Sequence, residues 1–124
     1  MAYIGSVVLD GALNVIRNTT ENLYICNAEP ATFAQASSTY RLGTRASPAF
    51  TGPGPGDVSG RKITVNAITD GAVTVTDTAT HWALTDDSGS ALLAAGALAG
   101  GGQVVTAGNT FTLGAFDVEF PAPA

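Results

Sequence analysis

"ATHWALTDDSGSALLAAGAL" (residues 79–98) is the stretch that most directly indicates the fold. It holds two short apolar runs, "THWALTD" and "ALLAAGAL", separated by "DSGS", whose residue types favour a tight turn. On a strand, successive side chains point to opposite faces, so Trp82 and Leu84 share one face and His81 lies on the other. We therefore predict two antiparallel strands, with Trp82 as the core anchor of their sheet.

The same kind of pattern continues on both sides of this stretch. Further strands are predicted at "RKITVNAI", "AVTVTDT", "QVVTA", "TFTLG" and "AFDVEF", with a turn at "TDG" (residues 69–71). Strands that recur about every 8 to 12 residues with turn residues between them are typical of an antiparallel β-sandwich or small barrel. Strands do not alternate with helices, so a parallel sheet is not expected. Residues 61–120 are therefore interpreted as a β-module.

The N-terminal part differs from this pattern. Residues 9–18 ("LDGALNVIRN") place Leu9, Ala12, Leu13 and Ile16 at helical spacing, and Asp10 suits the start of a helix. We predict one short amphipathic helix here, preceded by an apolar segment over residues 1–8. "ENLYICNA" and "TYRLGT" then read as strands, and "EPATFAQASS" between them as a turn with one helical turn.

Residues 44–60 ("TRASPAFTGPGPGDVSG") are rich in proline and glycine. Such a composition predicts an irregular arm with no regular element, used as a contact between subunits or as a flexible link. The tail, residues 121–124 ("PAPA"), is expected to be extended. The whole chain, residues 1–124, is long enough for one domain with its own core.

Charge is scarce in this chain. Asp, Glu, Lys and Arg make up 12% of the residues, against about 25% in an average domain. The net charge is −5 and the five basic residues are scattered, which disfavours a nucleic-acid partner. Few charges suggest that neighbouring subunits cover much of the surface.

The chain carries no signal-peptide pattern and no apolar run of the roughly 18 residues that a membrane helix needs. We therefore expect it to be made in the cytoplasm and to have no membrane partner. Its single cysteine excludes a disulfide within the chain. Cys26 lies in a predicted strand and is interpreted as a buried thiol; a reactive or intersubunit cysteine is the alternative.

The rare polar residues around Trp82 raise the question of an active site. A catalytic role for His81 would need an orienting group and a nucleophile within reach, and neither is evident. Calcium could bind oxygens of Asp86, Asp87 and Ser88, but the longer ligand pattern of a calcium loop is missing. These three residues are more simply the turn after a strand.

Two acids, Asp117 and Glu119, alternate with apolar residues near the C-terminus. Paired carboxylates hydrolyse glycosides only when they flank a cleft, and here a charged, solvated strand edge is the simpler interpretation. "GPGPG" and "GGG" lack the residues that follow in phosphate-binding loops. The sequence therefore predicts no enzyme, no small-molecule substrate and no catalytic, cofactor-binding or metal-binding residue.

Two stretches resemble known proteins. Residues 9–43, "LDGALNVIRNTTENLYICNAEPATFAQASSTYRLG", resemble the start of small proteins encoded in the structural gene clusters of tailed bacteriophages. "ATHWALTDDSGSALLAAGAL" followed by "VTAGNTFTLGAFDVEF" is similar to a β-module that recurs in phage virion proteins, with its "V-T-x-G-(N/D)-T" at Val105–Thr110. The resemblance covers about two-thirds of the chain and implies a structural protein of the virion, with no catalytic residues.

Within that class we favour a decoration (cement) protein on the outer surface of the capsid. Its partners would be the major capsid protein and further copies of itself, in a closed homo-oligomer such as a trimer. The candidate contact residues are Tyr3, Ile4, Val7, Val8, Phe50, Pro53 and Pro55.

Two other functions remain open at this stage. A tail or fibre component that touches a receptor or carbohydrate would need exposed aromatic side chains, for which Tyr24, Tyr40 and Trp82 are the candidates. A cell-wall hydrolase would have to depend on His81.

Overall fold

The computed structural model describes residues 6–55, 60–98 and 102–120, and it confirms a mainly β fold with antiparallel sheets and one N-terminal helix. In chain order the elements are α1 (Ser6–Thr19), β1 (Asn22–Cys26), the π-helical turn η1 (Gln35–Thr39), β2 (Arg41–Ala46), β3 (Phe50–Pro55), β4 (Arg61–Val65), β5 (Ile68–Val73), β6 (Asp77–Ala79), β7 (His81–Asp86), β8 (Ala91–Ala97), β9 (Gln103–Val105), β10 (Thr110–Leu113) and β11 (Phe116–Phe120). They form a six-stranded sheet of order β10-β5-β2-β1-β7-β8, a three-stranded sheet of order β11-β4-β3, and the pair β6-β9. In the described ranges these sheets are sandwich-like and none closes into a barrel.

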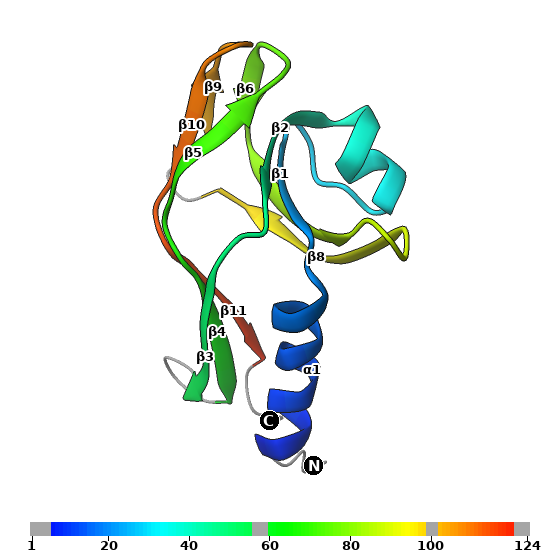
Figure 1. Cartoon of the computed structure of the whole chain (residues 1–124), viewed down its shortest axis with the longest axis vertical. Helices are drawn as coiled ribbons and strands as arrows, with labels where there is room; N and C mark the ends of the chain where they lie inside the picture. The colour runs from blue at the N-terminus through cyan, green and yellow to red at the C-terminus, as the bar shows by residue number, and fades with distance from the viewer. Residues whose placement is uncertain (1–5, 56–59, 99–101, 121–124) are drawn as a thin grey trace.

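Three stretches of chain run through both larger sheets. β2 continues into β3, β4 into β5, and β10 into β11, each after only two or three residues. The order β10-β5-β2 in one sheet therefore reappears as β11-β4-β3 in the other. Figure 1 shows these stretches bending from the end that carries β6 and β9 to the end that carries α1. Corners made by strands that bend from one sheet into the next are a usual way to close a β core.

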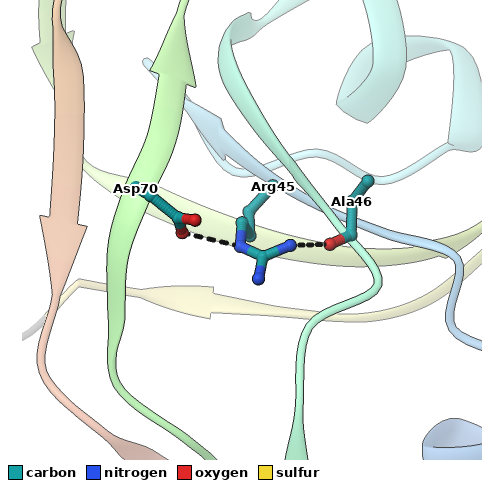
Figure 2. Close-up of polar contacts among 3 residues, drawn as sticks. All are labelled: Arg45, Ala46 and Asp70. Carbon is teal, nitrogen blue, oxygen red and sulfur yellow. Dashed lines mark hydrogen bonds and ion pairs between the residues drawn. The ribbon is translucent and has the colours of Figure 1, made fainter.

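An ion pair spans β2 and β5 where their pairing stops. The register pairs Gly43 with Val73 and Thr44 with Ala72 and goes no further. Just beyond, Arg45 Nε donates to Asp70 Oδ1 at 2.8 Å, and Arg45 Nη1 donates to the carbonyl oxygen of Ala46 (Figure 2). The guanidinium thus links two strands where no backbone hydrogen bonds join them.

The core has two clusters on opposite faces of the six-stranded sheet. Leu23 and Ile25 of β1 point into the larger cluster with Trp82 and Leu84 of β7. The alternate residues of the same strands form the smaller cluster, which the η1 segment covers. The smaller cluster contains Tyr24, Cys26, Ala36 and Ala83, with Tyr40, Leu92 and Ala95 packed against it. The alternation predicted for residues 81–85 is therefore present.

Helix α1 is longer than predicted and packs against β3 and β4 (Figure 1). Leu9, Leu13 and Ile16 are buried as their spacing predicted, whereas Ala12, expected on the same face, is exposed. The helix begins at Ser6 instead of residue 9, so Asp10 lies inside it and does not start it. Asp10 Oδ1 accepts a hydrogen bond from Arg61 Nε at 2.6 Å, and its Oδ2 accepts one from Nη2 at 3.2 Å. No helix in the described ranges is long and apolar enough to cross a membrane.

The expectation of an irregular arm over residues 44–60 was wrong. Residues 44–46 belong to β2, and β3 covers Phe50–Pro55; residues 56–59 lie outside the described ranges. Proline is tolerated in a strand when it stands at the edge of a sheet, where its missing N–H breaks no ladder. β3 is such an edge, because β4 is its sole neighbour in the three-stranded sheet.

The turn predicted at residues 69–71 was also wrong, because these residues lie inside β5. Gly71 is buried there and pairs with Phe111 of β10. The glycine makes room for the aromatic ring and does not mark a turn. The single strand predicted over residues 72–78 is divided between the end of β5 and the start of β6, and Val75, which lies between them, is exposed.

Candidate functional site

His81 and Trp82, neighbours in the sequence, lie in different surroundings. His81 is half-buried at the start of β7, and its Nδ1 lies 2.8 Å from Thr80 Oγ1. Its backbone pairs with Cys26 on one side and Ala97 on the other. Hydrogen bonding to the hydroxyl of the preceding residue holds the imidazole in place but does not form the acid, base and nucleophile set that catalysis requires.

Trp82 lies in the larger core cluster and is 8% exposed. Its ring stacks on Phe116 with centroids 4.6 Å apart and planes tilted by 36°. Gly96 faces the indole from β8, and a Cβ there would lie 2.8 Å from Trp82 Cζ2. The neighbouring strand thus has a glycine where the indole needs space.

A cavity of about 550 Å³ opens beside this aromatic pair. Its lining is mainly apolar, with Leu98 and Leu113 next to the two rings. Three polar residues also line it: Gln103, Thr112 and Asp117. Gln103 Nε2 donates to the carbonyl oxygen of Thr112, and Asp117 accepts from Lys62 and Thr64. Among the described lining residues, the side chains of Gln103 and Asp117 are therefore engaged in contacts within the protein, and most of the remaining wall is apolar.

The acids of the β7–β8 turn hold the turn together. Asp87 Oδ2 accepts a hydrogen bond from Tyr24 Oη at 2.6 Å, and its Oδ1 accepts one from Thr85 Oγ1 at 2.5 Å. Glu21 accepts from the backbone N–H of Ser88 at 2.6 Å, and this bond lowers the pKa of its carboxyl. Over the described ranges, no three metal-ligating side chains gather closely enough to hold an ion.

The same hydrogen bonds shift two pKa values in opposite directions. Burial opposes ionisation of Asp87, but hydrogen bonds from Thr85, Tyr24 and Asn22 outweigh it and lower the pKa of this carboxyl. Burial, with the hydrogen bond to Asp87 and the charge of that carboxylate, raises the pKa of Tyr24 to about 12. The turn therefore depends on a neutral phenol and a charged carboxylate.

Asp117 and Glu119 lie on β11, an edge strand of the three-stranded sheet. Asp117 Oδ2 accepts from Lys62 Nζ at 3.1 Å, and its Oδ1 accepts from Thr64 Oγ1 at 2.8 Å. Both donors belong to β4, the adjacent strand. Asp117 is thus engaged in a cross-strand contact with β4 and is not one of a pair of carboxylates across a cleft.

The three aromatic residues considered for carbohydrate binding do not form an exposed platform. Tyr24 is 4% exposed and Trp82 8%, and the half-buried Tyr40 packs against the smaller cluster. Cys26 is completely buried, with Sγ 3.8 Å from the carbonyl oxygen of Ala36, and burial raises its pKa to about 11. A thiol in this position is neither ionised nor accessible to another subunit.

The candidate contact residues are in different environments. Tyr3 and Ile4 lie outside the described ranges. Val7 and Val8 are 82% and 64% exposed on α1. Phe50 is half-buried and packs against the core.

Pro53 is half-buried and Pro55 exposed, both on β3. Arg17 of α1 donates to the carbonyl oxygen of Gly52 at 2.6 Å, so the helix and this strand lie at the same end of the molecule (Figure 1). Sequence reasoning missed Gly11 and Val15 and placed Ala12 on the buried face, but all three are exposed on α1 along with the two valines. The spacing of four between residues 7, 11 and 15 was the signal that could have identified them.

Comparison of the chain with protein-family models, with curated proteins and with solved structures finds no match in any of the three.

Proposed function

We propose that this chain is a structural protein of a tailed-bacteriophage virion, and specifically a decoration protein that binds the outer surface of the head as a homo-oligomer. The proposal begins from the resemblance of residues 9–43, 79–98 and 105–120 to phage structural proteins. Most of the last two stretches folds into the hairpin β7–β8 and the strands β10 and β11.

The observation that carries the proposal is the apolar surface of α1. A small chain with 12% charged residues and a helix that exposes three valines has a surface suited to contact with other proteins. The polar side chains considered for catalysis are engaged in hydrogen bonds that hold strands and turns together. An assembly role therefore accounts for more of the described surface than a hydrolytic one.

The test is co-sedimentation of the purified protein with separated heads and tails from a phage that encodes the chain, prepared without its gene. Saturable binding to heads in many copies per particle is expected. Binding to tails alone, at a few copies, would overturn the decoration role in favour of a tail or fibre component. Point variants on α1 serve better than deletion of residues 1–8, because the deletion would remove the first turn of the helix.

A further inference from the structure

We infer that the outer face of α1 is the surface on which two copies of this chain pack together, helix against helix. The outer face is formed by Val7, Val8, Gly11, Ala12 and Val15, all of them exposed. The inference deepens the proposed function and rests on it for its biological setting, because it names the surface through which copies of the decoration protein meet. The contact itself can be tested in solution without any phage particle.

The first argument is that α1 is apolar on both sides. Leu9, Leu13 and Ile16 point into the molecule, where β3 and β4 lie against the helix. Val7 and Val15 are 82% and 54% exposed, so they point away from this contact. A helix that packs on one side usually carries a single apolar stripe, so the second group of exposed apolar residues on α1 needs another explanation.

The second argument is charge, and it favours a second copy as the partner. α1 has two charged residues, and both are held against the sheet: Asp10 by Arg61, and Arg17 by the carbonyl oxygen of Gly52. The outer face is therefore uncharged in a chain whose net charge is −5. Two identical surfaces related by a two-fold axis can meet here without bringing like charges together. A strongly charged partner would find no complementary group on this face.

The third argument is the position of Gly11. Glycine weakens a helix relative to alanine, so an internal glycine needs a reason. The chain itself gives none, because a Cβ at Gly11 would have nothing within 4 Å of it. Gly11 lies four residues from both Val7 and Val15, at the centre of the outer face. Bare backbone at that point allows a second helix to approach closely, with valines on either side of the crossing.

The contact is small, and this determines how it should be measured. From Val7 to Val15 the helix rises only about 12 Å, at roughly 1.5 Å per residue. A surface of this size is below that of a standard stable interface, so we expect weak association that many copies on one particle would strengthen. Covalent trapping is therefore a better measurement than elution volume.

The chain is well suited to cysteine cross-linking. Its own Cys26 is completely buried and does not react while the protein is folded. Val7→Cys and Val15→Cys chains are mixed and oxidised, and Val104→Cys is the matched control because Val104 is 77% exposed on β9, away from α1 (Figure 1). We expect the α1 cysteines to form disulfide-linked dimers on the order of tenfold faster than the control, because association raises their effective concentration.

A second pair of variants tests the surface itself. Adding Val7→Glu to the Val15→Cys chain should abolish the rapid cross-linking, and adding Val104→Glu, which introduces the same charge elsewhere, should leave it unchanged. Circular dichroism verifies that both variants fold. Equal rates for the α1 cysteines and Val104→Cys would overturn the inference.

The outcome is separable from that of the proposed function. Rapid cross-linking without head binding would support this contact and overturn the decoration role. If Val7→Glu abolished head binding while the α1 cysteines cross-linked no faster than Val104→Cys, the outer face would be assigned to contact with the capsid. This inference alone would then be overturned.

Discussion

Gly71 shows how one residue sets the spacing of two strands. A Cβ at this position would lie 2.2 Å from Cε1 and Cζ of Phe111, whose side chain is 1% exposed and has no room to turn away. We predict that Gly71→Ala lowers the free energy of unfolding by about 1–3 kcal/mol, the usual cost of overpacking a core. Urea unfolding measures this. Gly114→Ala is the control, because a Cβ there meets nothing within 4 Å, and similar small losses in both variants would contradict the argument.

The hydrogen bond from Tyr24 to Asp87 is the second contact with a measurable consequence. We predict that Tyr24→Phe lowers the free energy of unfolding near neutral pH by about 1–2 kcal/mol, because it leaves a partly buried carboxylate short of a donor. Tyr40→Phe is the matched control, since no hydrogen bond of the Tyr40 hydroxyl is present in the described part of the chain. An equal loss of unfolding free energy in the two variants would show that the hydrogen bond to Asp87 does not contribute to stability.

The same pair predicts how stability depends on pH. The pKa of Tyr24 is raised from 10.0 to about 12 in the folded chain, so its contribution is complete below pH 10 and is lost as the pH rises toward 12. The pKa of Asp87 is lowered, so its contribution is present above the usual range of an aspartate and is lost as the pH falls through the folded value. Thermal unfolding across pH should show both declines in the wild type. Tyr24→Phe should flatten the alkaline decline, and an unchanged alkaline limb would contradict this assignment.

At the scale of elements, α1 is held by a few buried side chains. Leu13 of α1 is completely buried in the core, whereas Val15, two residues later on the same helix, is 54% exposed. We predict that Leu13→Ala costs about 2–5 kcal/mol of unfolding free energy, and that Val15→Ala changes it by less than about 0.5 kcal/mol. Urea unfolding should be measured at low protein concentration, so that association through α1 does not contribute. Equal effects would mean that the helix is not docked as described.

The elements also show what could be predicted from sequence and what could not. The strands near residues 81–86 and 91–97 were predictable, because alternation and a four-residue turn are local signals. β3 was missed because its prolines are acceptable only at a sheet edge, and an edge is a property of the whole sheet. The prediction of a turn at residues 69–71 was wrong for a similar reason. Gly71 is needed there because Phe111, which is distant in sequence, occupies the space beside it.

The same limit applies to the candidate assembly surface. The apolar N-terminal residues pointed to Val7 and Val8, and these are exposed. Phe50, another candidate contact residue, is half-buried and packs against the core. Helical spacing alone gives two apolar stripes on α1 and does not say which one faces the sheet. Gly11 and Val15 could therefore be assigned to the outer face only after the packing of the helix was known.

At the scale of the whole molecule, the two core clusters share the same strands and should unfold together. Trp82 reports on the larger cluster and Cys26 on the smaller, and each is the single residue of its kind in the chain. Buried beneath η1, with a pKa raised to about 11, the thiol should react with an alkylating reagent only when the sheet opens. We predict that the urea midpoint from brief alkylation of Cys26 coincides with that from Trp82 fluorescence, as in two-state unfolding.

A matched variant makes this comparison sharper. Cys26→Ala removes the reactive thiol. The Trp82 fluorescence unfolding curve of this variant shows how far the mutation itself changes stability. Any alkylation of the variant shows how much the reagent modifies other side chains. If Cys26 became reactive at urea concentrations where Trp82 emission is still native, the η1 cover would open separately from the rest. The smaller cluster would then be a local unit attached to the sheet, and the two faces of β1 and β7 would differ in stability although they share one backbone.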